Sequence, residues 1–301
     1  MSEDWLPPAW SKSQLQNLLE GCPWQWALKK VFGIDDPGGP ATARGTAFHA
    51  AVELHERARL RQLRDGADMD VRAPAELYEQ VRGVLGVEVE MLPSGTLEEH
   101  GTHEGKLQGE LLNLIENWWS AATDEGPTLR ERVARWRPVA IEPYFRVDLG
   151  NRRPAHGFID QLYWDPDAAQ WVVVDLKSAG SFRRWEGHWG HEVEAAMYAA
   201  GAALARGLPA GTPVRMEWHV VRPVARSRTV PLSRVVQVDP SDWPPERLAQ
   251  QSIAEAERRV LAGDLPKNTA WNLCSPKWCS AYEGCEVTGE LAPENLLPTL
   301  P

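Results

Sequence analysis

The chain has 301 residues, of which 43% are hydrophobic and 25% charged, a balance typical of folded globular proteins rather than disordered ones. Its formal net charge of −10 excludes a generally basic nucleic-acid coat, but it is compatible with an enzyme that holds a divalent cation among carboxylates. The opening MSEDWLPPAW lacks the apolar segment of a secretory signal, and no apolar run is long enough to cross a bilayer. We therefore expect a soluble cytoplasmic protein with no membrane partner.

The first third of the sequence carries helical patterns. Ser11 is suited to capping a helix, and leucines recur after it at helical spacing until Pro23. A loop rich in Gly and Pro, 35–43, precedes an amphipathic helix with His49 in its first turn. Helices are expected over 11–22, 24–32, 45–66, 74–90 and 107–118.

Short apolar or alternating stretches replace this pattern after residue 137. Three consecutive antiparallel strands are expected over 138–150, 154–164 and 170–178. A helix, two strands, another helix and an irregular tail follow. This order predicts an α/β fold with a central mixed sheet flanked by helices. We expect one integrated domain with an N-terminal helical region, a sheet core and a C-terminal cysteine-rich closure, bounded at 1–135, 136–240 and 241–301.

The stretch VVVDLKS, 172–178, ends an apolar strand with two opposite charges. Because residues i and i+2 of a strand face the same way, Asp175 and Lys177 share a face. Asp160 lies on the preceding strand of the expected hairpin, so the two carboxylates can converge. Together they favour Mg²⁺ or Mn²⁺, with the lysine placed to orient or deprotonate water or to stabilise charge on a phosphate. The alternative is a solvated strand end preceded by a turn residue.

Four cysteines stand far apart in the sequence, one early and three near the end. They are Cys22, Cys274, Cys279 and Cys285. The late three lie in a polar segment with Pro and Gly, where burial in a core is not expected. Free thiols, a zinc ion or a [4Fe–4S] cluster would each suit four such residues in a cytoplasmic protein.

Five motifs in consistent order, between Ser11 and Cys285, resemble the PD-(D/E)XK nuclease superfamily. GFID followed by VVVDLKS is similar to its paired strands, the first with G-x-x-D and the second ending in D/E-x-K. RGTAFHAA resembles the G-x-x-x-H helix of its RecB-like branch, 11–34 is similar to the opening helix of that branch, and EAAMYAAG stands where the branch has Q-x-x-x-Y. The cysteine pattern resembles the iron–sulfur subset, which includes AddB-type helicase–nuclease subunits and CRISPR-associated and phage iron–sulfur exonucleases.

The resemblance implies a restriction-endonuclease-like core and a role for each matching residue. The implied ligands of one or two Mg²⁺ or Mn²⁺ ions are His49, Asp160, Asp175 and the carbonyl of Leu176. The implied catalytic residues are Lys177, Asp175 and Asp160. The implied ligands of a [4Fe–4S] cluster, which the resemblance favours over zinc, are Cys22, Cys274, Cys279 and Cys285. The residues expected to contact DNA or support the site are Tyr198, Glu194, Glu142, Arg183 and Arg184.

The sequence departs from the pattern of the branch in two places. Glu194 replaces the usual glutamine four residues before Tyr198, and its carboxylate could join the metal ligands or repel DNA phosphate. The late cysteines are spaced C-x4-C-x5-C, where many relatives have C-x2-C-x5-C, so a different loop is needed.

The resemblance implies a metal-dependent DNA nuclease, an exonuclease acting on single strands or duplex ends. It would work in recombination, repair, phage replication or CRISPR adaptation, with a helicase or another protein of those processes as partner. The rival interpretation is a catalytically idle, cluster-stapled DNA-binding or assembly subunit. A carboxylate glycosidase would need neither the lysine nor the thiolates.

Several polar residues have a simpler interpretation. His49 taken alone would be a packed or solvent-facing helix residue, and only its place in the motif order makes it a candidate ligand. His55, His100 and His103 are expected at the surface. Arg183 and Arg184 could grip phosphate or belong to a solvated loop, and the basic helix segment 56–65 is expected to be a solvated face.

Overall fold

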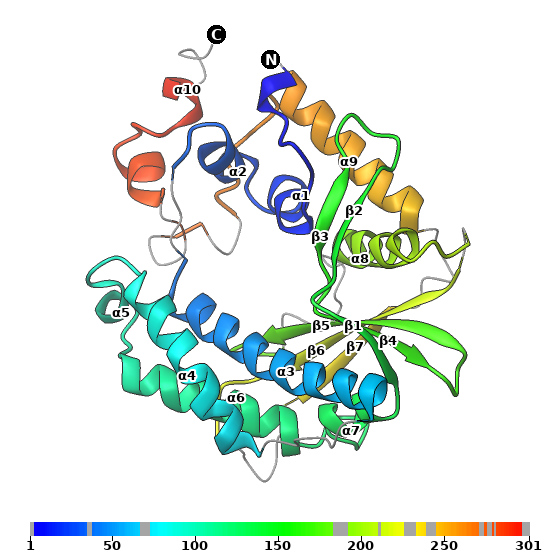
Figure 1. The fold of residues 1–301 in the computed structure, drawn as a ribbon. Helices are drawn as coiled ribbons and strands as arrows, with labels where there is room; N and C mark the ends of the chain where they lie inside the picture. The colour runs from blue at the N-terminus through cyan, green and yellow to red at the C-terminus, as the bar shows by residue number, and fades with distance from the viewer. Residues whose placement is uncertain are drawn as a thin grey trace.

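The structure is a computed structural model, and Figure 1 shows its fold. It describes residues 3–34, 38–66, 73–182, 192–209, 212–225, 233–238, 245–270, 274, 275, 279 and 281–296. The helices, in chain order, are η1 (Glu3–Trp5), α1 (Lys12–Leu19), α2 (Pro23–Lys30), α3 (Pro40–Asp65), α4 (Pro74–Glu90), α5 (Thr96–Glu99), α6 (Glu104–Ser120), α7 (Leu129–Ala134), α8 (Glu192–Ala205), α9 (Pro245–Ala262), the π-helical turn η5 (Glu283–Val287) and α10 (Pro293–Leu296).

A five-stranded mixed sheet lies at the centre, in the order β1-β4-β5-β6-β7, and confirms the predicted fold class. Its members are β1 (Arg137–Ile141), β4 (Gln161–Asp165), β5 (Gln170–Ser178), β6 (Val214–Val221) and β7 (Ser233–Val238). The pair β5–β6 is parallel and the other pairs are antiparallel. A separate two-stranded ribbon consists of β2 (Tyr144–Val147) and β3 (Ala155–Phe158).

The ribbon corrects the prediction of single strands over 138–150 and 154–164. Each of these stretches is divided in two, because Glu142 adopts a left-handed backbone with φ of 51° and Pro143 follows it. The amide of Glu142 donates to the carbonyl of Asp160 at 3.0 Å, and the amide of Ile159 donates to the carbonyl of Pro143 at 3.1 Å. The two stretches therefore bend together, and the ribbon leaves the sheet at the level of Glu142 and Asp160.

Local sequence explains how the first helices begin. Ser11 caps α1 in a reciprocal capping box with Gln14, and Pro23 takes the first position of α2, where its missing amide costs nothing. Helix α3 begins at Pro40, five residues before its predicted start, because a proline is also suited to a first helical turn.

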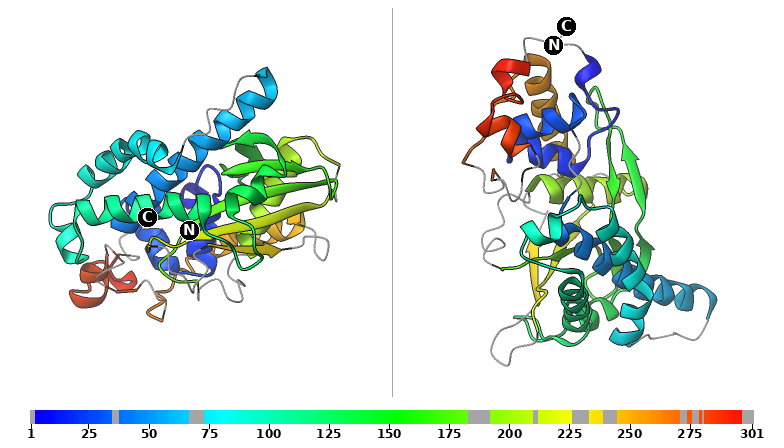
Figure 2. Two further views of the ribbon diagram at one scale, coloured as in Figure 1. Left: turned by 90° about the horizontal axis from the view of Figure 1, so that it is seen from below. Right: turned by 90° about the vertical axis from the view of Figure 1, so that its left-hand side faces the viewer.

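Helices cover both faces of the sheet. Successive residues of a strand point to opposite faces and therefore belong to two different apolar cores. Val172, Val174 and Leu176 of β5 pack with α3, α4 and α6. Val173 of β5 lies in the other core, which joins the N-terminal helices α1 and α2 to α8, α9 and C-terminal residues as far as Ala281. The right-hand view of Figure 2 shows the first and last segments of the chain side by side above α8.

The predicted surface position of His55 is wrong. Its side chain is buried between Trp118 and Trp119, with ring centroids 5.2 and 5.3 Å away, and Nδ1 lies 2.9 Å from Glu56 Oε1. Arg59, on the same helix, is also buried, where it ion-pairs with Glu56. The segment 56–65 is therefore only partly a solvated face.

The other two histidines lie near the start of α6. His103 is exposed and accepts a hydrogen bond from the amide of Lys106 as the N-cap of this helix, whereas His100 is half-buried. The surface prediction therefore holds for His103 and only partly for His100.

Candidate active site

A cleft of about 650 Å³ opens between α3 and the end of β5. His49 and Glu53 of α3, Glu142 from the turn after β1, and Lys177 of β5 line it. Helix α3 comes this close because it has no side chain at Gly45: a Cβ there would lie only 3.3 Å from Ser178 Oγ. The glycine of the RGTAFHAA motif thus has a packing role.

Three potential metal ligands converge in this cleft. One nitrogen of His49 and one carboxylate oxygen each from Glu142 and Asp160 all lie within 4.8 Å of one another. Asp160 Oδ2 is 3.4 Å from His49 Nδ1 and accepts the amide hydrogen of Leu176 at 2.7 Å. That hydrogen bond fixes the carboxylate against β5.

Burial and neighbouring negative charge raise the pKa of both carboxyl groups in this trio. Burial, with the nearby charge of Asp160, raises the pKa of Glu142 to about 8. Burial also raises the pKa of Asp160, although the charge of His49 opposes the shift. Two carboxylates held this close and away from water repel each other, so a cation between them would relieve the repulsion.

Glu142 reaches the site through an uncommon backbone. A non-glycine residue with positive φ costs on the order of 1 kcal/mol or more, and such conformations gather at functional sites. Here the conformation turns the chain sharply between β1 and β2 while the Glu142 amide stays bonded to Asp160. The sequence offered a sign of this turn in the proline that follows Glu142.

Asp175 lies beside the trio and is held by two lysines. Lys177 Nζ forms an ion pair with Asp175 Oδ2 and lies 3.0 Å from Glu194 Oε1. Lys12 Nζ of α1 lies 3.7 Å from Asp175 Oδ1 and also contacts Glu194. Two ammonium groups and two carboxylates therefore alternate in one buried cluster, and Glu194 is a counter-ion of both lysines.

The carboxylates decide the protonation of Lys177. Burial alone would lower its pKa, but the charges of Asp175 and Asp160 raise it above the ordinary value. The pKa of Asp175 shifts the other way: burial would raise it, but Lys177 and Lys12 lower it. At neutral pH the pair is therefore a carboxylate and an ammonium ion.

Lys12 is a site residue that the sequence did not reveal. Burial, together with the charge of Lys177, lowers its pKa to about 7, although Asp175 opposes the shift. Its ammonium also lies 5.2 Å from the ring centroid of Tyr198. The position of Lys12 directly after the capping serine of the SKSQ motif is its only sequence signal.

Tyr198 and Trp218 contact the lysine–carboxylate cluster through Lys12 and Glu194. Tyr198 is buried under Lys12 and beside the ring of Phe145, and burial with the charge of Asp175 raises its pKa well above the ordinary value. The indole nitrogen of Trp218 donates to Glu194 Oε2 at 3.1 Å. Such a buried ring fits a supporting role better than direct contact with DNA. Arg183 and Arg184 lie outside the described residues.

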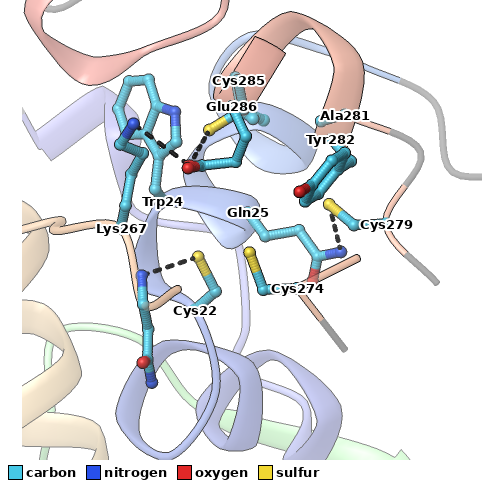
Figure 3. A pocket seen from close by; sticks show the side chains of 12 residues that line it. Cys22, Trp24, Gln25, Lys267, Cys274, Cys279, Ala281, Tyr282, Cys285 and Glu286 are labelled. Carbon is cyan, nitrogen blue, oxygen red and sulfur yellow. Dashed lines mark hydrogen bonds and ion pairs between the residues drawn. The ribbon is translucent and has the colours of Figure 1, made fainter. Parts of the chain in front are cut away.

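The four cysteines come together at a second place, beside α2. Figure 3 shows Cys22, Cys274, Cys279 and Cys285 around one pocket, beneath the turn that carries Cys285. Burial raises the pKa of Cys274, Cys279 and Cys285, the last to about 12 with Glu286 beside it. All four are free thiols.

Hydrogen bonds hold the C-terminal segment on the first two helices. Trp24 Nε1 donates to the carbonyl of Leu291 at 2.7 Å, and Asn268 Nδ2 donates to the carbonyl of Gly21 at 2.8 Å. The amide of Asn268 points at Cys22 Sγ, 3.5 Å away, and Gln25 Nε2 lies 3.5 Å from Cys279 Sγ. Donors near two of the sulfurs are suited to these cysteines as metal-bound thiolates.

Comparison with known proteins decides the family. The model of the PD-(D/E)XK nuclease superfamily matches residues 9–287, nearly the whole chain. The chain belongs to this superfamily. It therefore has the restriction-endonuclease-like fold of these metal-dependent nucleases, which generally use Mg²⁺ or Mn²⁺. No curated protein matches the chain in sequence.

One solved structure similar to this nuclease comes from Eubacterium rectale and is provisionally named an exonuclease. It is 11% identical, the match covers 95% of this chain and 93% of the other, and the TM-score is 0.48. Among the residues that the structure describes, no helix has the length and apolar character needed to span a membrane.

Proposed function

We propose that this nuclease is an exonuclease that hydrolyses DNA phosphodiesters in the cleft between α3 and β5. One observation carries the proposal: a histidine–carboxylate trio and a lysine–carboxylate pair meet at the ends of β4 and β5, beside an open cleft. The trio offers ligands for a hard cation, and the pair offers a fixed ammonium ion for a negatively charged substrate.

The trio fits Mg²⁺ or Mn²⁺. An ion with ligand distances of about 2.1 Å holds its most distant ligands about 4.2 Å apart, so atoms already within 4.8 Å need only small movements. We propose His49, Glu142 and Asp160 as ligands. Asp175 and the Leu176 carbonyl complete the set if the Lys177 pair opens or if a second ion binds. A bound ion would supply Lewis-acid stabilisation of the charge that develops on the phosphate.

The chain's own residues position the reactants. Because its neighbours keep Lys177 protonated, its ammonium would donate hydrogen bonds to a phosphate oxygen or to the attacking water rather than remove a proton. Asp175 fixes the direction of that ammonium. Glu194 and Lys12 hold the pair from the opposite side, and Trp218 holds Glu194. In-line attack of water would leave a 5′-phosphate and a 3′-hydroxyl.

We also propose that Cys22, Cys274, Cys279 and Cys285 bind a [4Fe–4S] cluster. In the described part of the chain, the sulfurs form no group of three within 4.8 Å of one another, whereas a zinc ion at about 2.3 Å from each sulfur needs them about 4 Å apart. The wider arrangement around one pocket suits a larger cluster better than a single ion. The cluster would join the C-terminal segment to α2, in addition to the hydrogen bonds already there.

The proposed setting is recombination, repair, phage replication or CRISPR adaptation, with single-stranded DNA or duplex ends as substrate and a helicase or similar protein as partner. The first test is cleavage of end-labelled single- and double-stranded DNA with Mg²⁺ or Mn²⁺. Wild type would be compared with Lys177→Ala and with a matched control, Lys106→Ala, whose lysine is exposed on α6.

Metal-dependent cleavage by wild type and the control, lost in Lys177→Ala, supports the proposal. DNA binding without turnover by a folded, cluster-loaded wild type contradicts it and favours an idle assembly subunit.

A further inference from the structure

The β2–β3 ribbon is joined to the proposed catalytic centre at both strands. Tyr144, the first residue of β2, follows Glu142 by two residues, and Phe158, the last residue of β3, precedes Asp160 by two. Two residues span at most about 7 Å, the length of about two stacked nucleotides. Tyr144 and Phe158 are therefore within reach of a nucleic acid bound at Glu142 and Asp160.

The two faces of the ribbon differ sharply. One face carries Phe145, Val147 and Ala155, which are buried against α8 and its neighbours. The right-hand view of Figure 2 shows the ribbon at the edge of the molecule, with α8 on one side of it only. The other face, which carries Tyr144 and Phe158, is in solvent.

Tyr144 and Phe158 are the two exposed aromatic side chains of the described residues. They are 49% and 57% exposed, and every other described Trp, Tyr or Phe is buried or half-buried. They pair directly across the ribbon, with ring centroids 5.2 Å apart and planes at 56°. Leaving two large rings in water beside the site loses burial energy, so a binding role is the simplest explanation.

Positive charge continues along the same face. The next cross-strand pair is Arg146 with His156, and Arg146 is exposed. The ring of His156 lies 6.2 Å from that of Tyr144, and burial together with the positive charges of Arg146 and Lys30 lowers its pKa. In a chain with a net charge of −10, a face with two exposed rings and an exposed arginine matches a polyanion with accessible bases.

The patch is too small for a stable protein partner. Two aromatic side chains bury at most about 500 Å² together, whereas a specific protein interface buries about 1,000 Å² or more. A DNA duplex does not fit either, since its bases are already stacked on one another. Unpaired bases have free faces, which stack on aromatic side chains in a way that tolerates any sequence.

We propose that Tyr144 and Phe158 form a stacking platform for unpaired bases of a DNA single strand whose scissile phosphate lies in the cleft. Arg146 contacts a phosphate of the same strand. The inference rests on the proposed nuclease function and adds to it a substrate class: the strand is unpaired within about two nucleotides of the cleaved bond, also where the cut lies at a duplex end.

The test uses the full chain with Tyr144→Ile and Phe158→Ile combined. Isoleucine keeps strand propensity and apolar character but has no ring face. A second variant exchanges the rings, Tyr144→Phe with Phe158→Tyr. Val87→Ala, at a 56% exposed apolar residue of α4, is the matched control, and circular dichroism checks folding. Affinity for a labelled oligo(dT), and for the same oligomer with abasic sites, is measured in Ca²⁺, followed by cleavage in Mg²⁺.

The double isoleucine variant should bind oligo(dT) at least about fivefold more weakly, while the ring exchange and Val87→Ala bind like wild type. Abasic oligomers should bind wild type and the isoleucine variant equally. Normal oligo(dT) affinity of the isoleucine variant, with wild type cleaving DNA, overturns the platform alone. If wild type neither binds nor cleaves DNA, the proposed function fails and the platform falls with it.

Discussion

Replacing Glu217 by glutamine should destabilise the protein by removing a buried charge from a pre-formed network. Glu217 lies on β6 with no solvent exposure, on the opposite face of the sheet from Asp175. Arg132 donates two hydrogen bonds to its carboxylate, at 2.9 and 2.8 Å. His219 Nε2 lies 3.0 Å from it and Arg215 Nε 3.1 Å.

The size of the effect follows from the pKa of this carboxyl group. Burial alone would raise the pKa, but the hydrogen bonds from Arg132 and His219 lower it from 4.5 to about 2. Lowering the pKa from 4.5 to about 2 corresponds to about 3 kcal/mol of stability at neutral pH, at roughly 1.4 kcal/mol per pH unit. Because the folded-state pKa lies below the unfolded one, this stability is fully present above pH 4.5 and is lost as the pH falls towards 2.

The assay is urea unfolding of wild type and Glu217→Gln, at neutral pH and between pH 5 and pH 3. We expect the variant to lose about 3 kcal/mol at neutral pH, within the usual cost of breaking a buried ion pair. At about 0.6 kcal/mol per kelvin for a chain of 301 residues, this is a Tm lower by about 5 °C. The variant should also show a shallower loss of stability on acidification.

A matched control is Glu125→Gln, which removes the exposed partner of the same Arg132. Exposed pairs contribute little, so we expect less than about 1 kcal/mol. A loss below 1 kcal/mol for Glu217→Gln, or acid profiles of equal steepness for the variant and wild type, would refute the reasoning. Nuclease activity per folded molecule should not change in either variant.

Three further predictions concern the two candidate sites. Because burial lowers the pKa of Lys12 from 10.5 to about 7, protonation of this lysine opposes folding, so the urea stability of metal-free Lys12→Met relative to wild type should fall by about 2 kcal/mol from pH 6 to pH 8.5; a difference that does not change with pH would contradict this. Glu142→Gln should weaken Mn²⁺ binding at least about tenfold by calorimetry, and an unchanged affinity would exclude Glu142 as a ligand. Cys22→Ser should lose iron and sulfide on chemical analysis but keep the Mn²⁺ affinity of wild type, whereas retained iron and sulfide would show that Cys22 is not a ligand.

The central hairpin is the part of the site that the sequence predicts most fully. Period-two alternation fixes the faces of Asp175 and Lys177, and the short DPDAA turn fixes which strand lies beside them. In the structure Gln161 pairs with Val174, so the end of β4 does bring Asp160 to β5. Local rules are sufficient here because the contacts are local in sequence.

Contacts between distant segments were not predictable in the same way. Lys12 reaches Asp175 because α1 packs on α8, across more than 160 residues of chain. The polar pattern of its helix predicts a solvated His55. In the structure the tryptophans of α6 pack against its ring, and Glu56 is its hydrogen-bond partner. Pattern and propensity describe one segment at a time, whereas these positions depend on which helix covers which face of the sheet.

The predicted strand over 138–150 is two strands in the structure, and the cause is local. The alternation of apolar and polar residues does not reveal it. The stretch over 138–150 alternates on both sides of Glu142, so one strand and two strands give the same pattern. Only the positive φ at Glu142 and the proline after it separate them. That bend brings Glu142 into the cleft and turns the ribbon out of the sheet.

The most direct test of the central claim is the single-turnover cleavage rate of a pre-bound, end-labelled single strand in Mn²⁺, for wild type and Asp160→Asn. We predict metal-dependent cleavage by wild type, with cleavage by Asp160→Asn slower by about a thousandfold or more although the strand remains bound. Cleavage by Asp160→Asn at the wild-type rate would contradict the claim that the cleft between α3 and β5 is the catalytic centre.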